Sequence, residues 1–94
     1  MEIDDIYGYD FEIIDIRDKN EFNESHLDNA RNVSLNNIII NPSVYLKKDR
    51  NYLLICEYGI QSRIVMKILN RLGYHTYTLK DGYRGLISKR KVQK

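Results

Sequence analysis

Short apolar runs separated by polar residues predict a chain of brief strands and helices. Residues 11–16 and 51–55 are rich in isoleucine or leucine and are too short for core helices, so each predicts a buried strand. Residues 30–33 and 74–79 predict two further short strands. Residues 41–51 are polar and contain the only proline, so they are expected to form a surface connection.

One long amphipathic helix is predicted over residues 62–72. Its apolar side chains recur at helical spacing, and Gly73 supplies the expected stop. The apolar stripe consists of Ile64, Val65, Ile68, Leu69 and Leu72. This helix and the strands before and after it form a strand–helix–strand unit, which implies parallel pairing through a right-handed crossover. The expected fold is α/β, a small parallel β-sheet covered by helices.

Two shorter helices are predicted from capping residues. Asp18 and Glu21 have the spacing of a capping box, which predicts a brief helix over residues 19–23. Ser34 is the expected cap of a helical turn that Pro42 ends.

Length and composition indicate one small globular domain. The chain has 94 residues, of which 43% are hydrophobic and 30% charged. We expect a single domain over residues 1–88, followed by a basic C-terminal tail, 89–94, that is solvated and frayed. The net charge of +2 is too small to indicate nucleic acid binding.

The protein is expected to be cytoplasmic. No apolar stretch approaches the ~20 residues of a membrane span. Residues 1–5 are acidic, unlike a signal peptide. The single cysteine cannot form an internal disulfide, which fits a reducing compartment. With two histidines and one cysteine, no spacing resembles a zinc site, so no metal and no cofactor are expected.

Cys56 is the main candidate for chemistry. It follows the predicted strand 51–55 and precedes a loop that contains Gly59 and leads into the predicted helix. A helix N-terminus aimed at the sulfur favours a thiolate, and ligands of parallel sheets bind beyond the carboxyl ends of the strands. The alternative is that Cys56 is a small packing residue at the end of a core strand.

Several stretches resemble the rhodanese family of sulfurtransferases. Residues 14–17, 21–22 and 25–33 are similar to the family's Asp-Val-Arg, Glu-Phe and Gly-His-Ile-Pro-Gly-Ala-x-Asn-Ile signature. Residues 56–62 read Cys-Glu-Tyr-Gly-Ile-Gln-Ser, where the family usually has Cys-x-x-Gly-x-Arg-Ser. Residues 72–74 and 81–86 look like the family's Leu-Gly-aromatic and Gly-Gly-x-x-x-Trp segments. The resemblance covers nearly all of the chain and implies a rhodanese-like fold, with helices on both faces of the sheet.

The activity that the resemblance implies is sulfur transfer in two steps. Cys56 would take the outer sulfur of a donor, become a persulfide, and pass that sulfur to an acceptor. The expected donor is thiosulfate or a protein that carries a persulfide, and the expected acceptor is a thiol or cyanide. The loop residues expected to bind the substrate are Glu57, Tyr58, Gly59, Ile60, Gln61 and Ser62.

Gln61 departs from the family pattern at an important place. The family arginine there would hold an anionic donor, whereas a neutral amide supplies no charge. Thiosulfate activity is therefore expected to be weak, and a protein persulfide would need less charge in the pocket. Arg63, in the first turn of the predicted helix, is the candidate for a compensating anion contact. Glu57 would bring a carboxylate beside the sulfur.

Four residues match family positions that look architectural, namely Asp15, Arg17, Glu21 and His26. Arg17 and Glu21 are expected to pair, and His26 to hydrogen-bond the backbone.

Two other functions remain open. A rhodanese-like module without turnover would relay sulfur or bind a partner through the same fold. A phosphatase or arsenate reductase of related fold would need a loop one residue longer, with arginine as the sixth residue after the cysteine. This chain has Ser62 at that place.

Overall fold

The structure is a computed structural model that describes residues 10–92, with side chains described for residues 10–88. Four parallel strands form one sheet in the order β2-β1-β3-β4. They are β1 (Glu12–Asp15), β2 (Arg31–Asn32), β3 (Asn51–Ile55) and β4 (His75–Thr78). All four predicted strands are therefore present, and most are shorter than predicted. The acidic segment 1–5 lies outside the described residues.

The strand register brings the carboxyl ends of three strands to one edge. Asp15 of β1 is opposite Ile55 of β3 on one side and Asn32 of β2 on the other. The residues that follow β1 and β3, including Arg17 and Cys56, therefore lie at the same edge of the sheet.

Helices α1 (Lys19–Glu24) and α2 (Leu35–Ile40) begin at the predicted caps. The Asp18 carboxylate accepts a hydrogen bond from the Glu21 N–H (2.9 Å), and Ser34 Oγ accepts one from the Asn37 N–H (3.3 Å). Pro42 ends α2 as predicted, and it also opens α3 (Pro42–Tyr45), because a proline is favourable at the first helical position.

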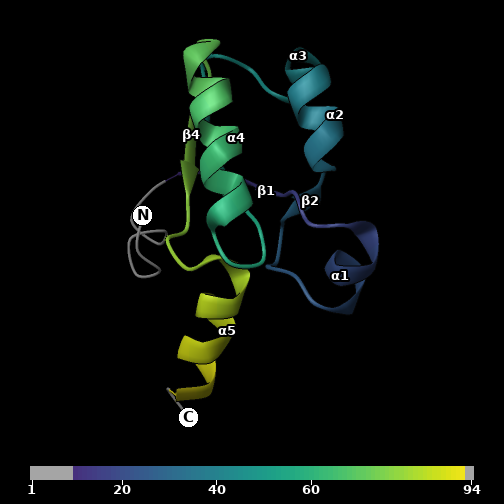
Figure 1. Ribbon diagram of the computed structural model, residues 1–94, viewed down its shortest axis with the longest axis vertical. Helices are drawn as coiled ribbons and strands as arrows, with labels where there is room; N and C mark the ends of the chain where they lie inside the picture. The colour runs from purple at the N-terminus through teal and green to yellow at the C-terminus, as the bar shows by residue number, and fades with distance from the viewer. Residues whose placement is uncertain (1–9, 93–94) are drawn as a thin grey trace.

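Helix α4 (Ile60–Arg71) packs beside α2 on one face of the sheet (Figure 1). The core on this face includes Ile14, Leu54, Val65 and Leu69. On the opposite face, α5 (Gly82–Val92) contributes Tyr83 and Leu86 to a second core that includes Leu53 and Ile55. Successive side chains of β3 alternate between the two cores, as a strand requires. The prediction of helices on both faces is confirmed.

The buried side of α4 differs from the predicted apolar stripe. The buried residues are Ser62, Val65 and Leu69, whereas Ile64 is 56% exposed and Leu72 is half exposed. The Ser62 side chain points inward, where it contacts the Cys56 sulfur. With Ser62 on the buried side of α4, Ile64 lies on the solvent side of the helix. The helix ends as predicted, at Gly73 with a φ of +99°.

The hydrophobic pattern does not predict α5. This helix continues to Val92, so it enters the segment 89–94 that the sequence indicates as a tail, and residues 93–94 lie outside the described part. In the described part of the chain, no helix is both long and apolar enough to cross a membrane.

Candidate active site

Cys56 lies directly after β3 and is 1% exposed. Three groups contact its sulfur, one from Gly59 in the following loop and two from Ser62 in the first turn of α4. The Gly59 N–H donates to Sγ at 3.0 Å, and the Ser62 N–H donates at 3.3 Å. The thiol in turn donates to the Ser62 hydroxyl oxygen at 3.1 Å. Donors converging on one sulfur favour negative charge on it.

Gly59 gives the loop its curvature. Its φ is +87°, which L side chains rarely adopt. A Cβ at this position would also lie 2.4 Å from the Lys80 carbonyl oxygen, on the segment between β4 and α5. Only glycine fits here without moving the backbone, so the inward N–H of Gly59 depends on its being glycine.

The first turn of α5 holds the loop from the outside. The Tyr83 N–H donates to the Cys56 carbonyl at 2.8 Å, and the Arg84 N–H donates to the Glu57 carbonyl at 2.9 Å. The Cys56 and Glu57 carbonyls thus point away from the sulfur, toward α5. The N–H groups of the residues that follow can then point toward the sulfur. Gly82 permits this approach, with a φ of +65° and no room for a Cβ.

A buried charge pair supports the same edge of the sheet. Arg17 forms a salt bridge with Asp15 (Nη2 to Oδ2, 2.8 Å) and lies over the Tyr83 ring, 4.1 Å from its centroid. Burial acts to lower the pKa of Arg17, but its hydrogen bonds and charge attraction with Asp15 raise the pKa overall. Arg17 is therefore a permanent cation beside the loop. Its predicted pairing with Glu21 is wrong, because the side chain folds back onto the strand end instead.

Glu57 turns away from the sulfur, toward other charged groups. Its Oε1 is 3.0 Å from Arg84 Nε and 4.0 Å from Arg17 Nη1. A side-chain hydrogen bond to Glu57, together with burial and the nearby carboxylates, raises the pKa of Glu21 to about 7. The charges of Glu21 and Glu57 are therefore coupled, and two arginines lie near Glu57 to compensate its charge.

The remaining candidate residues lie at the surface around the loop. Tyr58 is 63% exposed and Ile60 is 65% exposed, and Gln61 and Arg63 are also exposed. The structure thus brings Cys56, Gly59 and Ser62 together, whereas the other candidate residues surround them at the protein surface. His26 makes the predicted backbone contact, with Nδ1 2.8 Å from the Phe22 carbonyl oxygen.

Sequence reasoning missed the contribution of α5. Tyr83 and Arg84 matter through their backbone N–H groups, which carry no residue-specific signal. The one available signal was Gly82, since a glycine just before a helix indicates a positive φ or a close approach of two backbones.

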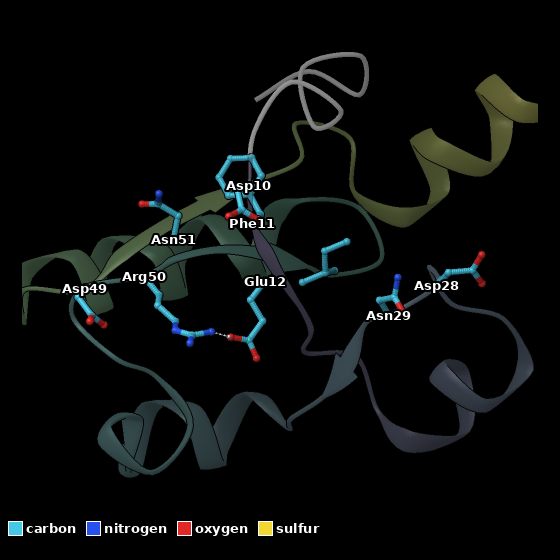
Figure 2. Close-up of a pocket in the computed structure, with 9 residues that line it drawn as sticks. Asp10, Phe11, Glu12, Asp28, Asn29, Asp49, Arg50 and Asn51 are labelled. Carbon is cyan, nitrogen blue, oxygen red and sulfur yellow. Dashed lines mark ion pairs between the residues drawn. The ribbon is translucent and has the colours of Figure 1, made fainter.

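A cavity of about 630 Å³ lies at the opposite end of the sheet, around the starts of β1 and β3 (Figure 2). Four of its nine lining residues carry a carboxylate, and Arg50 forms an ion pair with Glu12 there (4.0 Å). Cys56 is not among the lining residues, so this cavity is separate from the sulfur site.

Fold and site together define a class: a parallel α/β domain in which a cysteine after a central strand is held in a ring of loop donors. The family of rhodanese-like domains matches residues 3–89. The chain belongs to this family, which confirms the resemblance in its motifs.

One relative and two solved structures agree with this assignment. The thiosulfate sulfurtransferase GlpE of Shewanella oneidensis is 33% identical over 75 residues, which is 77% of this chain and 71% of the relative. A rhodanese-related protein from Thermoplasma volcanium superimposes with a TM-score of 0.87 at 21% identity, covering 95% of this chain and 90% of that one. The protein SSP1007 from Staphylococcus saprophyticus gives 0.76 at 23% identity, covering 82% and 76%. At these identities the two structures show the shared fold alone.

Proposed function

We propose that this protein is a sulfurtransferase in which Cys56 carries the transferred sulfur as a persulfide. The donor is thiosulfate or a protein persulfide, and the acceptor is a thiol or cyanide. The observation that carries the proposal is the set of three hydrogen bonds around Sγ, all at 3.0–3.3 Å: two backbone N–H groups donate to the sulfur, and the thiol donates to the Ser62 hydroxyl. A packing cysteine needs no such hydrogen bonds, because it behaves as a small apolar residue.

In the first step, the Cys56 thiolate attacks the outer sulfur of the donor. A new S–S bond forms on Cys56 as the donor's own S–S bond breaks, and its electron pair leaves with sulfite or with the donor thiolate. The loop amides of Gly59 and Ser62 stabilise negative charge on the sulfur before and after transfer.

Ser62 can serve both charge states of the sulfur. Its hydroxyl accepts the thiol proton in the present arrangement and donates to the Gly59 carbonyl over 3.4 Å. That second bond is long, so the hydroxyl can turn to donate to a thiolate or persulfide at little cost.

In the second step, a thiophilic acceptor attacks the outer sulfur of the Cys56 persulfide. The S–S bond breaks, the thiolate returns, and the enzyme is ready for another donor. A cytoplasmic setting is part of the proposal, because the thiol must stay reduced between cycles.

The neutral side chain of Gln61 is the reason to propose a protein persulfide as a sulfur donor besides thiosulfate. It is exposed and brings no charge to the loop, and the nearby Arg84 is already paired with Glu57. A divalent anion such as thiosulfate gains less in these surroundings than in a loop with arginine. A persulfide delivered by a protein gains its binding energy elsewhere on the surface.

The test is turnover with each donor. Thiocyanate formation from thiosulfate and cyanide, and sulfide release from glutathione persulfide and dithiothreitol, are measured for the protein and for Cys56→Ser. The proposal expects turnover above the uncatalysed rate with at least one donor, and only the uncatalysed rate in the variant. Loading of Cys56 without turnover would favour the relay module instead, and equal rates in the variant would contradict the proposal.

A further inference from the structure

The outward side of α4 begins at the active-site loop and carries a mixed apolar and cationic surface. Ile60, Arg63, Ile64 and Lys67 are all exposed, and their spacing places them on one side of the helix. Tyr58, in the loop, extends this surface toward Cys56. We call these five residues the α4 face.

The cations of this helix are unpaired within the described residues. Helix α4 contains Arg63, Lys67 and Arg71 and no carboxylate. The salt bridges among residues 10–88 instead involve other arginines, at positions 17, 31, 50 and 84. The α4 face therefore combines exposed apolar area with positive charge that no described carboxylate neutralises. This combination fits a partner whose surface is acidic and partly apolar.

A hollow beside this face adds room for a partner side chain. A cavity of about 310 Å³ lies between α4 and the end of β4, lined by Arg63, Met66, Tyr77, Thr78 and Lys80. Its volume suits one apolar anchor residue, which is the usual centre of a protein interface.

The position of the α4 face links it to the chemistry. Ile60 follows Gly59 directly, and Ser62, in the same helical turn, contacts the sulfur. The α4 face therefore begins beside the residues that contact the sulfur, and a partner bound here lies next to the active-site loop. Because Cys56 is 1% exposed, the incoming sulfur must be presented on a slender group such as a persulfide.

We propose that the α4 face docks an acidic protein that donates sulfur from its own cysteine persulfide. The inference rests on the proposed function and names its donor. The Cys56 thiolate attacks the outer sulfur of that persulfide, the partner's S–S bond breaks, and its electron pair leaves with the partner's thiolate. The sulfur keeps its oxidation state, so the step needs no oxidant or reductant. A second copy of this chain is a less favourable binding partner for the α4 face, because the two cationic faces would repel each other.

The test uses two synthetic peptides that each carry one persulfidated cysteine and the same apolar residues. One peptide has glutamates at its charged positions and the other has lysines. The rate of sulfur transfer to Cys56 is followed by quenched-flow mass spectrometry, with thiosulfate and glutathione persulfide as small donors. We expect the acidic peptide to react about tenfold faster at low salt, and the difference to shrink at high salt.

The variant Lys67→Glu should remove most of this preference and leave transfer from the small donors unchanged. Lys47→Glu is the matched control, because Lys47 is also exposed but precedes the start of β3, whereas Cys56 follows its other end. Thermal melting confirms that both variants are folded.

If small donors load the protein but both peptides react with it at equal rates, the docking inference is overturned and the proposed function stands. Failure of every donor to load Cys56 would overturn both. A dimer in sedimentation that Lys67→Glu dissociates would assign this face to a second copy instead.

Discussion

The N–H of Tyr83 donates a 2.8 Å hydrogen bond to the carbonyl of Cys56, so the first turn of α5 holds the residue that we propose to carry the transferred sulfur. The neighbouring Arg84 N–H does the same for Glu57. The active-site loop is thus fixed from two sides: α4 supplies the donors that face the sulfur, and α5 engages the carbonyls that face away from it. The sulfur site is a property of the contact between the loop and α5 as much as of the loop itself.

Replacing Gly82 with alanine should disrupt this contact. A Cβ there would lie 2.5 Å from the Gly59 N and 2.6 Å from the Cys56 carbonyl oxygen. We expect a loss of about 2 kcal/mol or more in the free energy of unfolding by urea, with slow loading of sulfur onto Cys56.

Gly73→Ala is the matched control for Gly82→Ala. Gly73 also has a positive φ, but a Cβ there would meet only the Lys48 side chain, at 3.5 Å or more. It should cost about 1 kcal/mol and leave loading intact. Equal loading in both variants would show that the α5 contact does not shape the loop.

Ser62→Ala should slow sulfur loading by about tenfold while the fold persists, because it removes the one side-chain hydroxyl in the ring and keeps both backbone donors. Single-turnover loading from glutathione persulfide is the measurement. Ser34→Ala serves as control, since it removes a helix cap whose hydroxyl bonds the Asn37 N–H and not the sulfur, and it should lower stability by about 1 kcal/mol without slowing transfer. An unchanged rate in Ser62→Ala would restrict Ser62 to a packing role.

Gln61→Arg should improve the use of thiosulfate. A guanidinium at this exposed loop position adds charge attraction to the anion, and we expect about a tenfold gain in kcat/KM at low salt. Gln61→Met, of similar length and neutral, should show no gain. An arginine variant that performs like the methionine variant would mean that charge at position 61 does not govern donor choice.

The Glu21–Glu57 pair should make stability depend on pH. The pKa of Glu21 is raised from 4.5 to about 7 in the folded protein, so the folded state binds this proton more tightly than the unfolded chain. The stabilisation is full below about pH 4.5 and is lost as the pH rises to about 7. Melting temperatures from pH 4.5 to 8 should therefore fall more steeply for the protein than for Glu21→Gln. Parallel curves would contradict this assignment.

Periodicity and capping predicted most of the fold from the sequence. Strand 51–55 has the predicted bounds, and Asp18 and Ser34 cap their helices, because these signals are local. Helix α5 was missed because its apolar face is weakly periodic. Its role also depends on contacts between backbones that are distant in sequence. The helical spacing of apolar residues also predicted that Ile64 is buried, which is wrong. That spacing carries no sign that the Ser62 side chain points inward toward the sulfur.

The sulfur site was predicted in part. The position of Cys56 after a strand, and of Gly59 in the loop that follows, predicted that backbone N–H groups surround the sulfur. The pairing of Arg17 was mistaken, because spacing of four residues suggests a pair only when both residues share one helix, and Arg17 precedes α1.

The most direct test of sulfur transfer through Cys56 is the intact mass of the reduced protein after incubation with glutathione persulfide and, separately, with thiosulfate. We expect a gain of one sulfur atom that cyanide removes and that Cys56→Ser does not show. No gain with either donor, or the same gain in Cys56→Ser, would contradict it.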